Sequence, residues 1–97
     1  MSALFISRIT IKEPSTFQDY LNKSKAVAGE HGAELLVSAA NPRALAGHAT
    51  PHQMVVVVRF PSMEAVTAWH DSAAYQNLIP LREAGSDQEI TVYHIND

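Results

Sequence analysis

The sequence has no cysteine, only four glycines and only seven lysines and arginines among its 97 residues. Without cysteine there is no disulfide framework, no thiolate nucleophile and no cysteine-ligated metal, and both oxidising and reducing compartments are tolerable. The net charge is −3 at pH 7, and so few scattered cations provide no basic surface for the phosphates of a nucleic acid. We therefore expect no nucleic-acid partner.

Long apolar runs and targeting signals are also missing. No window approaches the roughly 18 apolar residues of a membrane span, and no basic segment precedes the short apolar stretch at residues 3–6. There is no low-complexity tract, charge block or Gly/Ser linker, so residues 1–97 are expected to form one domain. The prediction is an untargeted, cytoplasmic protein without a membrane partner.

The most informative segment that is present is a run of four valines within Met54-Val55-Val56-Val57-Val58-Arg59-Phe60. A strand with one face in water alternates apolar and polar residues, whereas this strand is apolar on both faces. Both faces must then be covered, which predicts a partner subunit.

Strands are expected at residues 3–11, 34–39, 54–60 and 89–95, because these segments are rich in β-branched and aromatic residues. The only long loop is expected at residues 41–53, where Asn-Pro and Ala-Gly pairs mark turns. A second helical region follows the valine strand, is interrupted near residue 71 and continues as short turns at 73–78 and 80–84.

The helix boundaries carry sequence signals. The first helix begins either with Pro14 as its first residue or with Ser15 as N-cap and Gln18 completing a capping box. It is expected to end near residue 31, because Gly32 stands where a C-terminal glycine belongs. Ser62 is suited to cap the second helix.

The resulting order, β-α-β-β-α-β, is that of the α+β ferredoxin-like fold, a four-stranded antiparallel sheet with both helices on one face. The first, third and fourth strands also place apolar side chains on the other face, and a large exposed apolar patch indicates association. Two such sheets packed face to face in a two-fold homodimer curl into a barrel. We therefore predict a dimeric α/β barrel with the open sheet face as its interface.

A long segment carries a family resemblance. Residues 60–76, FPSMEAVTAWHDSAAYQ, followed by Leu81-Arg82, closely resemble the domain of unknown function 1330 family of the dimeric α/β-barrel superfamily. The likeness extends over nearly the whole chain, through the opening strand, Phe17 and Tyr20 in the first helix, and Gly32. It implies the fold and a dimer.

The middle of the chain departs from the family pattern. Residues Ser38-Ala39-Ala40 stand where the family often carries an Arg-Gly-Gly-like segment, and His48-Ala49 follows Leu45-Ala46-Gly47 where an aromatic residue is often found. Relatives in the superfamily include cofactor-independent monooxygenases, lactone isomerases and haem-binding enzymes, so the fold alone indicates no single chemistry.

Polar residues near the second helix are the candidate lining of a pocket between the sheet and its helices. His70 and Asp71 offer an imidazole and a carboxylate, the pair needed to move a proton, and are the candidate catalytic residues. Adjacent helical residues point about 100° apart, so these two are not expected to bond each other. The alternative is a boundary histidine, with Asp71 or Ser72 capping the next helical turn.

Arg82 is suited to bind the carboxylate of a small acid through two parallel hydrogen bonds. Its alternative role is a structural salt bridge with Asp71 or Glu83. Tyr75 is expected to pack its ring or to point its hydroxyl into the pocket.

Trp69 shares the inward helical stripe with Val66, which favours a core position over a platform for ligand stacking. His94 has the strand parity of Ile90 and Val92, so it either faces the pocket or frays with the terminus. Together with Ser72, Tyr75 and Arg82, both are candidate substrate-binding residues.

His48 and His52 are separated by four positions in the long loop, with Pro51 between them. Two imidazoles at this spacing share a face only on a helix. Zinc also needs at least three protein ligands, so the fold would have to bring a third ligand, such as His94, to the two loop histidines. We expect both to be solvated loop residues, and we predict no metal and no cofactor.

Two functional hypotheses follow. The first is a homodimer that binds a small apolar, acidic or aromatic metabolite between sheet and helices. The alternative is a cofactor-independent, isomerase- or monooxygenase-like enzyme in which His70 is the base and Arg82 and Tyr75 orient the substrate. No phosphate loop, nucleophile elbow or redox cysteine pair decides between them.

Overall fold

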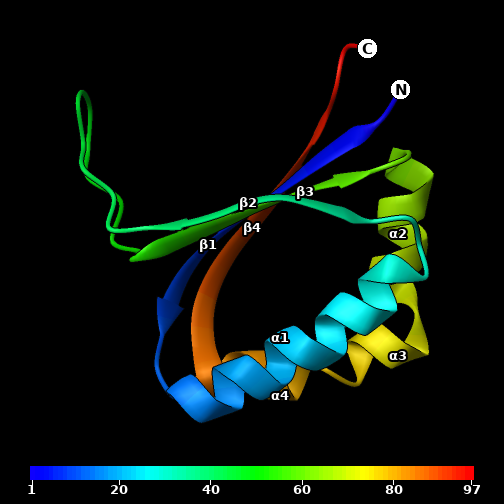
Figure 1. Ribbon diagram of the computed structural model, residues 1–97, viewed down its shortest axis with the longest axis horizontal. Coiled ribbons are helices and arrows are strands. Elements are labelled where there is room, and N and C mark those ends of the chain that lie inside the picture. Colours follow the sequence, from blue (N-terminus) through cyan, green and yellow to red (C-terminus); the bar gives the residue numbers. More distant parts are fainter.

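A computed structural model describes all of residues 1–97 as one twisted sheet with helices on one of its faces (Figure 1). The elements are β1 (Ala3–Ile11), α1 (Pro14–Gly29), β2 (Glu34–Ala40), β3 (Met54–Phe60), α2 (Met63–Asp71), α3 (Ala73–Gln76), α4 (Ile79–Gly85) and β4 (Ser86–His94). The strand order is β2-β3-β1-β4 and every pairing is antiparallel. The predicted α+β ferredoxin-like fold is confirmed.

The helix boundaries follow local chemistry. Pro14 is the first residue of α1, as one of the two expected starts requires, and Ser15 bonds the side chain of Glu13 instead of capping the helix. The helix ends at Gly29, two residues earlier than expected, and Gly32 supplies the turn with a φ of 78°, which glycine adopts without strain. Ser62 caps α2 as predicted, because its Oγ accepts a hydrogen bond from the Ala65 amide at 3.0 Å.

The last strand begins earlier than the sequence indicates. β4 starts at Ser86, three residues before the predicted start, and residues 86–88 pair with residues 11–9 of β1. Ser86, Asp87 and Gln88 have little intrinsic strand preference, so pairing with the central strand decides their conformation. The expected end at residue 95 is one residue too late.

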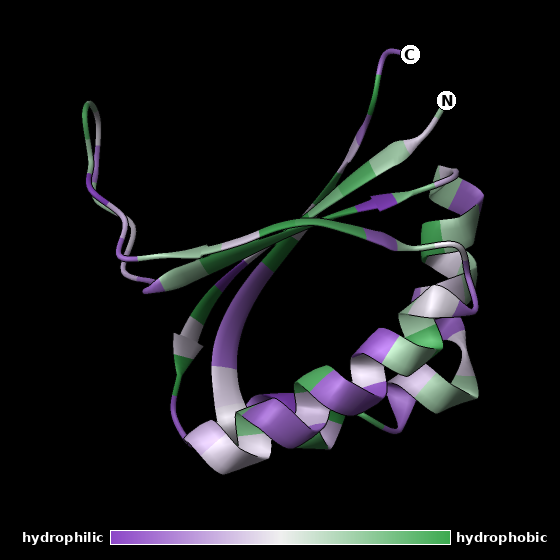
Figure 2. Cartoon of the chain, in the orientation of Figure 1, coloured by the Kyte–Doolittle hydropathy of each residue, from purple (hydrophilic) through white to green (hydrophobic).

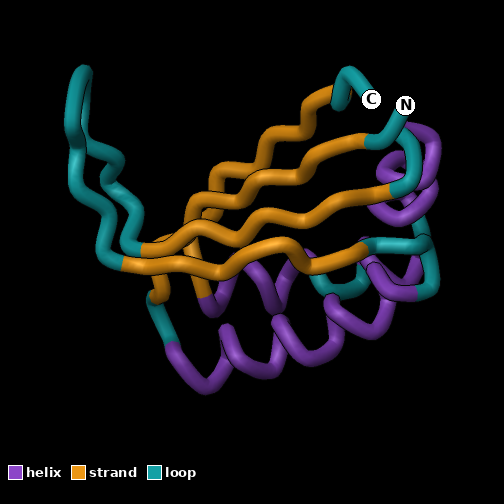
Figure 3. The backbone as a smooth tube through the Cα atoms, turned by 45° about the horizontal axis from the view of Figure 1, so that its top comes forward, coloured by secondary structure: helices purple, strands orange, loops and turns teal.

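All of the helices lie on one side of the sheet (Figure 3), and alternation along the strands decides which side chains meet them. The helix-facing side chains include Phe5 and Ile9 of β1 and Phe60 of β3, which belong to the buried core together with Ala3, Phe17, Tyr20, Val66, Trp69 and Tyr75. Because β1 lies at the centre of the sheet, its odd-numbered side chains form the middle of the sheet surface against which the helices pack.

The other face of the sheet carries no helix, and its middle is apolar. Val37, Val57 and Ile6 are neighbours across β2, β3 and β1, and hydrophobic colour extends over adjacent strands in Figure 2. Val55 and the half-exposed Tyr93 also lie on this open face. None of the helices combines the length and hydropathy needed to cross a membrane.

Candidate functional site

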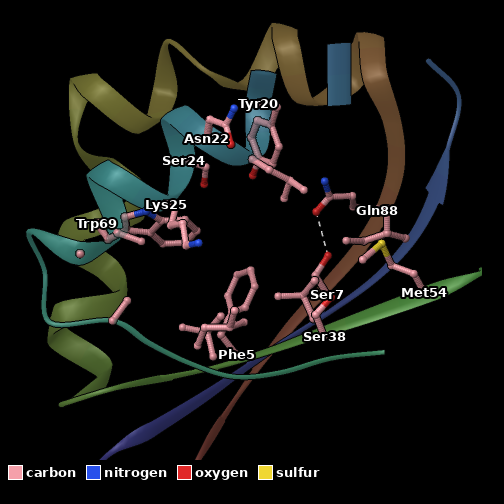
Figure 4. A pocket seen from close by; sticks show the side chains of 18 of the residues that line it. Phe5, Ser7, Tyr20, Asn22, Ser24, Lys25, Ser38, Met54, Trp69 and Gln88 are labelled. Carbon is pink, nitrogen blue, oxygen red and sulfur yellow. Dashed lines mark hydrogen bonds between the residues drawn. The ribbon is translucent and has the colours of Figure 1, made fainter. Parts of the chain in front are cut away.

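A cavity of about 240 Å³ lies between α1 and the helix-facing side of the sheet (Figure 4). Twelve of its twenty lining residues are hydrophobic, among them Ile9, Val56, Val58 and Phe60 from the strands. A largely apolar cavity with a few polar groups is the usual form of a small-molecule site. An apolar cavity of about 150 Å³ is enough to admit benzene, so this one has the capacity for a slightly larger molecule.

The residues that line the cavity follow the side-chain periods of a strand and of a helix. On β1 and β3 every second residue points to the cavity, which gives Phe5, Ser7 and Ile9 on one strand and the even-numbered residues on the other. On α1 the cavity is met by Tyr20, Leu21, Ser24, Lys25 and Ala28, which share one helical face.

The polar groups on the sheet side are held in fixed orientations. The Ser7 side chain is 2% exposed, and its Oγ donates to Gln88 Oε1 at 2.8 Å. Gln88 Nε2 in turn donates to Ser86 Oγ at 3.0 Å, and Ser86 Oγ donates to the Arg82 carbonyl at 2.9 Å. The amide of Gln88 is therefore fixed at the cavity wall by the start of β4.

Trp69 forms a partition between this cavity and a second one. Trp69, Phe5 and Gln88 line both. The indole is 3% exposed, and its Nε1 is the one buried side-chain nitrogen or oxygen without a hydrogen-bond partner. An unpaired buried donor is costly, and this N–H is the polar group that the fold leaves without a partner.

The second site is a more open groove of about 450 Å³ between α2, α4 and β4. It brings together three of the predicted polar residues, His70, Asp71 and Arg82, against an apolar wall that includes Ile90 and Val92. Trp69 belongs to both this groove and the core, where its ring centroid is 4.2 Å from that of Tyr75.

The expectation that His70 and Asp71 do not bond each other is wrong. His70 Nδ1 lies 3.3 Å from Asp71 Oδ1, and both side chains are at least half exposed. The two residues stand at the C-terminal end of α2, where the flexible side chains reach each other despite the angle between their Cα–Cβ bonds. The pair therefore has the contact that a proton-accepting imidazole needs, at a solvent-exposed place.

Arg82 bonds Glu83 rather than Asp71. Its Nη2 donates to Glu83 Oε1 at 3.1 Å, which is one of the two structural salt bridges expected from the sequence. Its Nη1 donates to the Tyr75 hydroxyl at 3.0 Å, and that hydroxyl lies 2.8 Å from the hydroxyl of Tyr20. Tyr75 is fully buried and lines neither cavity, so its hydroxyl does not reach a pocket.

The remaining predicted residues lie apart from both cavities. Ser72 caps α3, since its Oγ accepts from the Tyr75 amide at 3.1 Å and donates to the Trp69 carbonyl at 2.7 Å. His94 is exposed at the end of β4 and lines neither site. Ser72 thus acts as the helix cap that the sequence allowed as its alternative role.

One of the two loop histidines differs from expectation. His48 is exposed, but His52 is only 9% exposed, with Nδ1 2.9 Å from Thr10 Oγ1 and Nε2 3.6 Å from Glu89 Oε1. The Gln53 amide donates to the Ile9 carbonyl, which extends the pairing of β1 and places residue 52 beside that strand. No group of three or more His, Cys, Asp or Glu side chains is arranged to hold a metal ion.

The sequence interpretation missed Tyr20, Ser7 and Gln88 as cavity residues. Each has a polar atom on a row that is otherwise apolar. Tyr20 lies on the inward side of α1, Ser7 lies between Phe5 and Ile9, and Gln88 has the strand parity of Ile90 and Val92. A polar group at such a position needs a buried partner or a ligand, and here the partners come from distant parts of the chain.

Comparison with known proteins supplies the family. A model described as a domain of unknown function, DUF1330, matches residues 2–94. The chain belongs to the DUF1330 family. No curated protein matches it.

Several solved structures share the fold of this DUF1330 chain. A protein of unknown function from Rhodopseudomonas palustris superposes with a TM-score of 0.81 at 13% identity, covering 95% of this chain and 80% of its own. SnoaB, a cofactor-independent oxygenase from Streptomyces nogalater, has a TM-score of 0.71 at 11% identity, covering 99% and 94%. A dimeric ferredoxin-like protein of unknown function from Thermobifida fusca has a TM-score of 0.63 at 13% identity, covering 98% and 92%. These likenesses establish the fold alone.

Proposed function

We propose that this DUF1330 protein binds a small, largely apolar organic metabolite in the cavity between α1 and the sheet. The observation that carries the proposal is the cavity itself, an apolar space of about 240 Å³ in a chain of only 97 residues. Cores are normally packed to crystal-like density with few voids larger than a water molecule. This space is a cleft beside the core that reaches solvent at exposed lining residues such as Leu35 and Lys25, and an apolar cleft left unfilled there is best explained by an occupant.

The lining also supports a ligand with some polar character. Ser7 and Gln88, which are joined by a hydrogen bond of 2.8 Å, stand on otherwise apolar walls. Such sites use apolar contact for affinity and a few placed polar groups for orientation. The ligand class is accordingly an apolar body with one or a few polar atoms.

Filling the cavity tests this proposal. Ala28→Phe places a ring on the cavity face of α1, whereas Ala26→Phe puts the same ring on the exposed face of the same helix. Tetralin, a bicyclic hydrocarbon, serves as the probe in calorimetric titrations, with Trp69 emission as a second signal because it is the only tryptophan. We expect binding by the parent protein and by Ala26→Phe, and none by Ala28→Phe.

Two results would count against the cavity as the site. Equal binding by both variants would place tetralin elsewhere on the protein. Failure of the parent protein to bind tetralin, with its fold intact by circular dichroism, would remove the proposal that the cavity accepts apolar molecules of this size.

We also propose that the protein is a homodimer joined through the open sheet face. Its support is the row of Val37, Val57 and Ile6 that nothing in one chain covers, since an exposed apolar patch of this kind marks an association surface. The similar protein from Thermobifida fusca is dimeric. In a two-fold arrangement the same row of each copy faces the other, and the cavities remain on the outer, helix-covered sides.

A second candidate function is proton transfer without a cofactor in the groove beside α2. The 3.3 Å contact of His70 with Asp71 and the presence of Arg82 in the same groove favour it, and SnoaB, which shares the fold, is a cofactor-independent oxygenase. In this candidate His70 accepts a proton from a carbon acidified by a neighbouring carbonyl, and Asp71 stabilises the imidazolium formed.

Deuterium exchange tests the second candidate. With 2-tetralone in heavy water, NMR measures replacement of the hydrogens next to the carbonyl. We expect acceleration by the parent protein and a loss of about 10²-fold or more in His70→Gln, while His48→Gln, on an exposed loop, keeps the parent rate. Equal rates in the two variants would remove His70 as a base.

A further inference from the structure

A buried chain of hydrogen bonds leads from α4 to the wall of the ligand cavity. Arg82 Nη1 donates to the Tyr75 hydroxyl at 3.0 Å, and the Tyr75 hydroxyl lies 2.8 Å from the Tyr20 hydroxyl. Arg82 and Tyr75 are outside the cavity lining, whereas Tyr20 belongs to it. The chain therefore connects a charged group to a single hydroxyl at the cavity.

The direction of the chain follows from which groups are able to donate. A guanidinium has donors only, so the Tyr75 oxygen accepts from Arg82. Tyr75 is 0% exposed, and the one other partner of its hydroxyl is the Tyr20 oxygen. The Tyr75 hydrogen must therefore point to Tyr20, because the opposite direction would leave it buried without an acceptor.

This arrangement leaves the hydrogen of the Tyr20 hydroxyl for another acceptor. Its remaining polar neighbour is Ser24, one turn further along α1 and also on the cavity wall; Figure 4 shows both side chains extending from α1 toward the sheet. Burial, and then Tyr75, hold the pKa of Tyr20 well above its usual value of 10.0. The hydroxyl thus keeps its hydrogen at any physiological pH.

We propose that the Tyr20 hydroxyl donates the hydrogen bond that positions the ligand, so that the cavity selects apolar molecules bearing an acceptor oxygen, such as a ketone or quinone carbonyl. This inference rests on the proposed binding function and names the ligand class for the same cavity. The competing sheet-side hydroxyl, Ser7, already donates to Gln88. Ser24 and Ser38 also line the cavity, but Tyr20 is the lining hydroxyl whose oxygen is already engaged by a donor, Tyr75, so its hydrogen is left for a second partner, either Ser24 or a ligand oxygen.

A matched pair of probes tests the donor. 1-Tetralone and tetralin have the same bicyclic frame, and only the ketone has an acceptor oxygen. We expect the ratio of their dissociation constants, tetralin over 1-tetralone, to fall about tenfold from the parent protein to Tyr20→Phe, since one hydrogen bond to a buried group is worth about that factor. Tetralin affinity itself should be unchanged, and the infrared carbonyl stretch of bound 1-tetralone should move to higher frequency in Tyr20→Phe.

Tyr75→Phe is the control that separates donation from structure. It breaks the same 2.8 Å contact between the two hydroxyl oxygens but leaves the Tyr20 hydroxyl and its hydrogen in place, so we expect the parent preference and the parent carbonyl frequency. An equal loss of preference in Tyr20→Phe and Tyr75→Phe would show a structural pair and overturn the inference. Unchanged ratios in both variants, with both probes bound, would overturn it while leaving the binding function intact. If neither probe binds the parent protein, both proposals fail.

Discussion

At the scale of single residues, the packing of α4 against α1 depends on one missing side chain. A Cβ added to Gly85 would lie 2.7 Å from the Phe17 amide nitrogen and 2.9 Å from the Phe17 Cα. These are backbone atoms, so they move only if α1 moves. The absence of a side chain at Gly85 thus allows α4 to approach the start of α1 closely. This close approach in turn fixes the position of α1 above the cavity.

We predict that Gly85→Ala lowers the free energy of unfolding by about 1–3 kcal/mol, the range for overpacking a tight contact. Urea denaturation followed by circular dichroism measures it. Gly29→Ala is the control, because nothing lies within 4 Å of a Cβ at that position and alanine is the better helix former. Equal stability of the two variants would show that α1 yields freely to the added methyl group.

The buried tyrosine pair predicts a dependence of stability on alkaline pH. Because burial raises the pKa of Tyr20 in the folded state above its ordinary value of 10.0, the folded protein holds this proton when the unfolded chain has lost it. The stabilising contribution is complete below pH 10 and declines as the pH rises above that value, at most by about 1.4 kcal/mol per pH unit. Denaturation midpoints measured at intervals from pH 8 to 12, in the parent and in Tyr20→Phe, should diverge only above pH 10. Parallel curves would mean that Tyr20 titrates normally.

At the scale of elements, alternation along β3 assigns neighbouring valines to different surfaces. Val56 and Val58 line the cavity, whereas Val55 and Val57 lie on the open face. The sequence predicted a strand covered on both sides, but four valines in succession hold no information on which side meets the helices. That assignment comes from the pairing of β3 with β1, where Phe5 and Ile9 fix the core side.

We predict that Val57→Lys dissociates the proposed dimer, because it introduces an unpaired charge at the centre of the interface, at a cost of several kcal/mol. Sedimentation velocity over a range of concentrations is the measurement. Ala26→Lys adds the same charge to an exposed helical position and should sediment as the parent protein does. A Val57→Lys protein that remains dimeric would exclude the open face as the interface.

Other elements show which features of the fold local sequence patterns predict and which they do not. The order of elements, the Pro14 start of α1 and the Ser62 cap of α2 depend on neighbouring residues, and all three were predictable. The early start of β4 and the burial of His52 depend on pairing with the central strand β1. Long-range pairing of this kind leaves no trace in local composition, so both were missed.

At the scale of the whole molecule, one of the two candidate sites was predictable from local sequence and the other was not. The groove beside α2 is built largely from one stretch of chain, and the sequence predicted its His70, Asp71 and Arg82. The cavity under α1 is built from β1, α1, β2, β3, α2 and β4 together, and the link between Tyr20 and Tyr75 spans 55 residues. Such a site exists only once the fold has brought these elements together, so only its separate polar residues were visible beforehand.

Both the ligand class and the role of Tyr20 depend on a small molecule binding between α1 and the sheet. Intermolecular nuclear Overhauser effects between 1-tetralone and methyl-labelled protein test it most directly, because adjacent valines of β3 report opposite faces. We expect contacts from 1-tetralone to the methyl groups of Val56 and Val58 and none to those of Val55 and Val57. Contacts confined to Val55 and Val57 would place the ligand on the open face and contradict binding between α1 and the sheet.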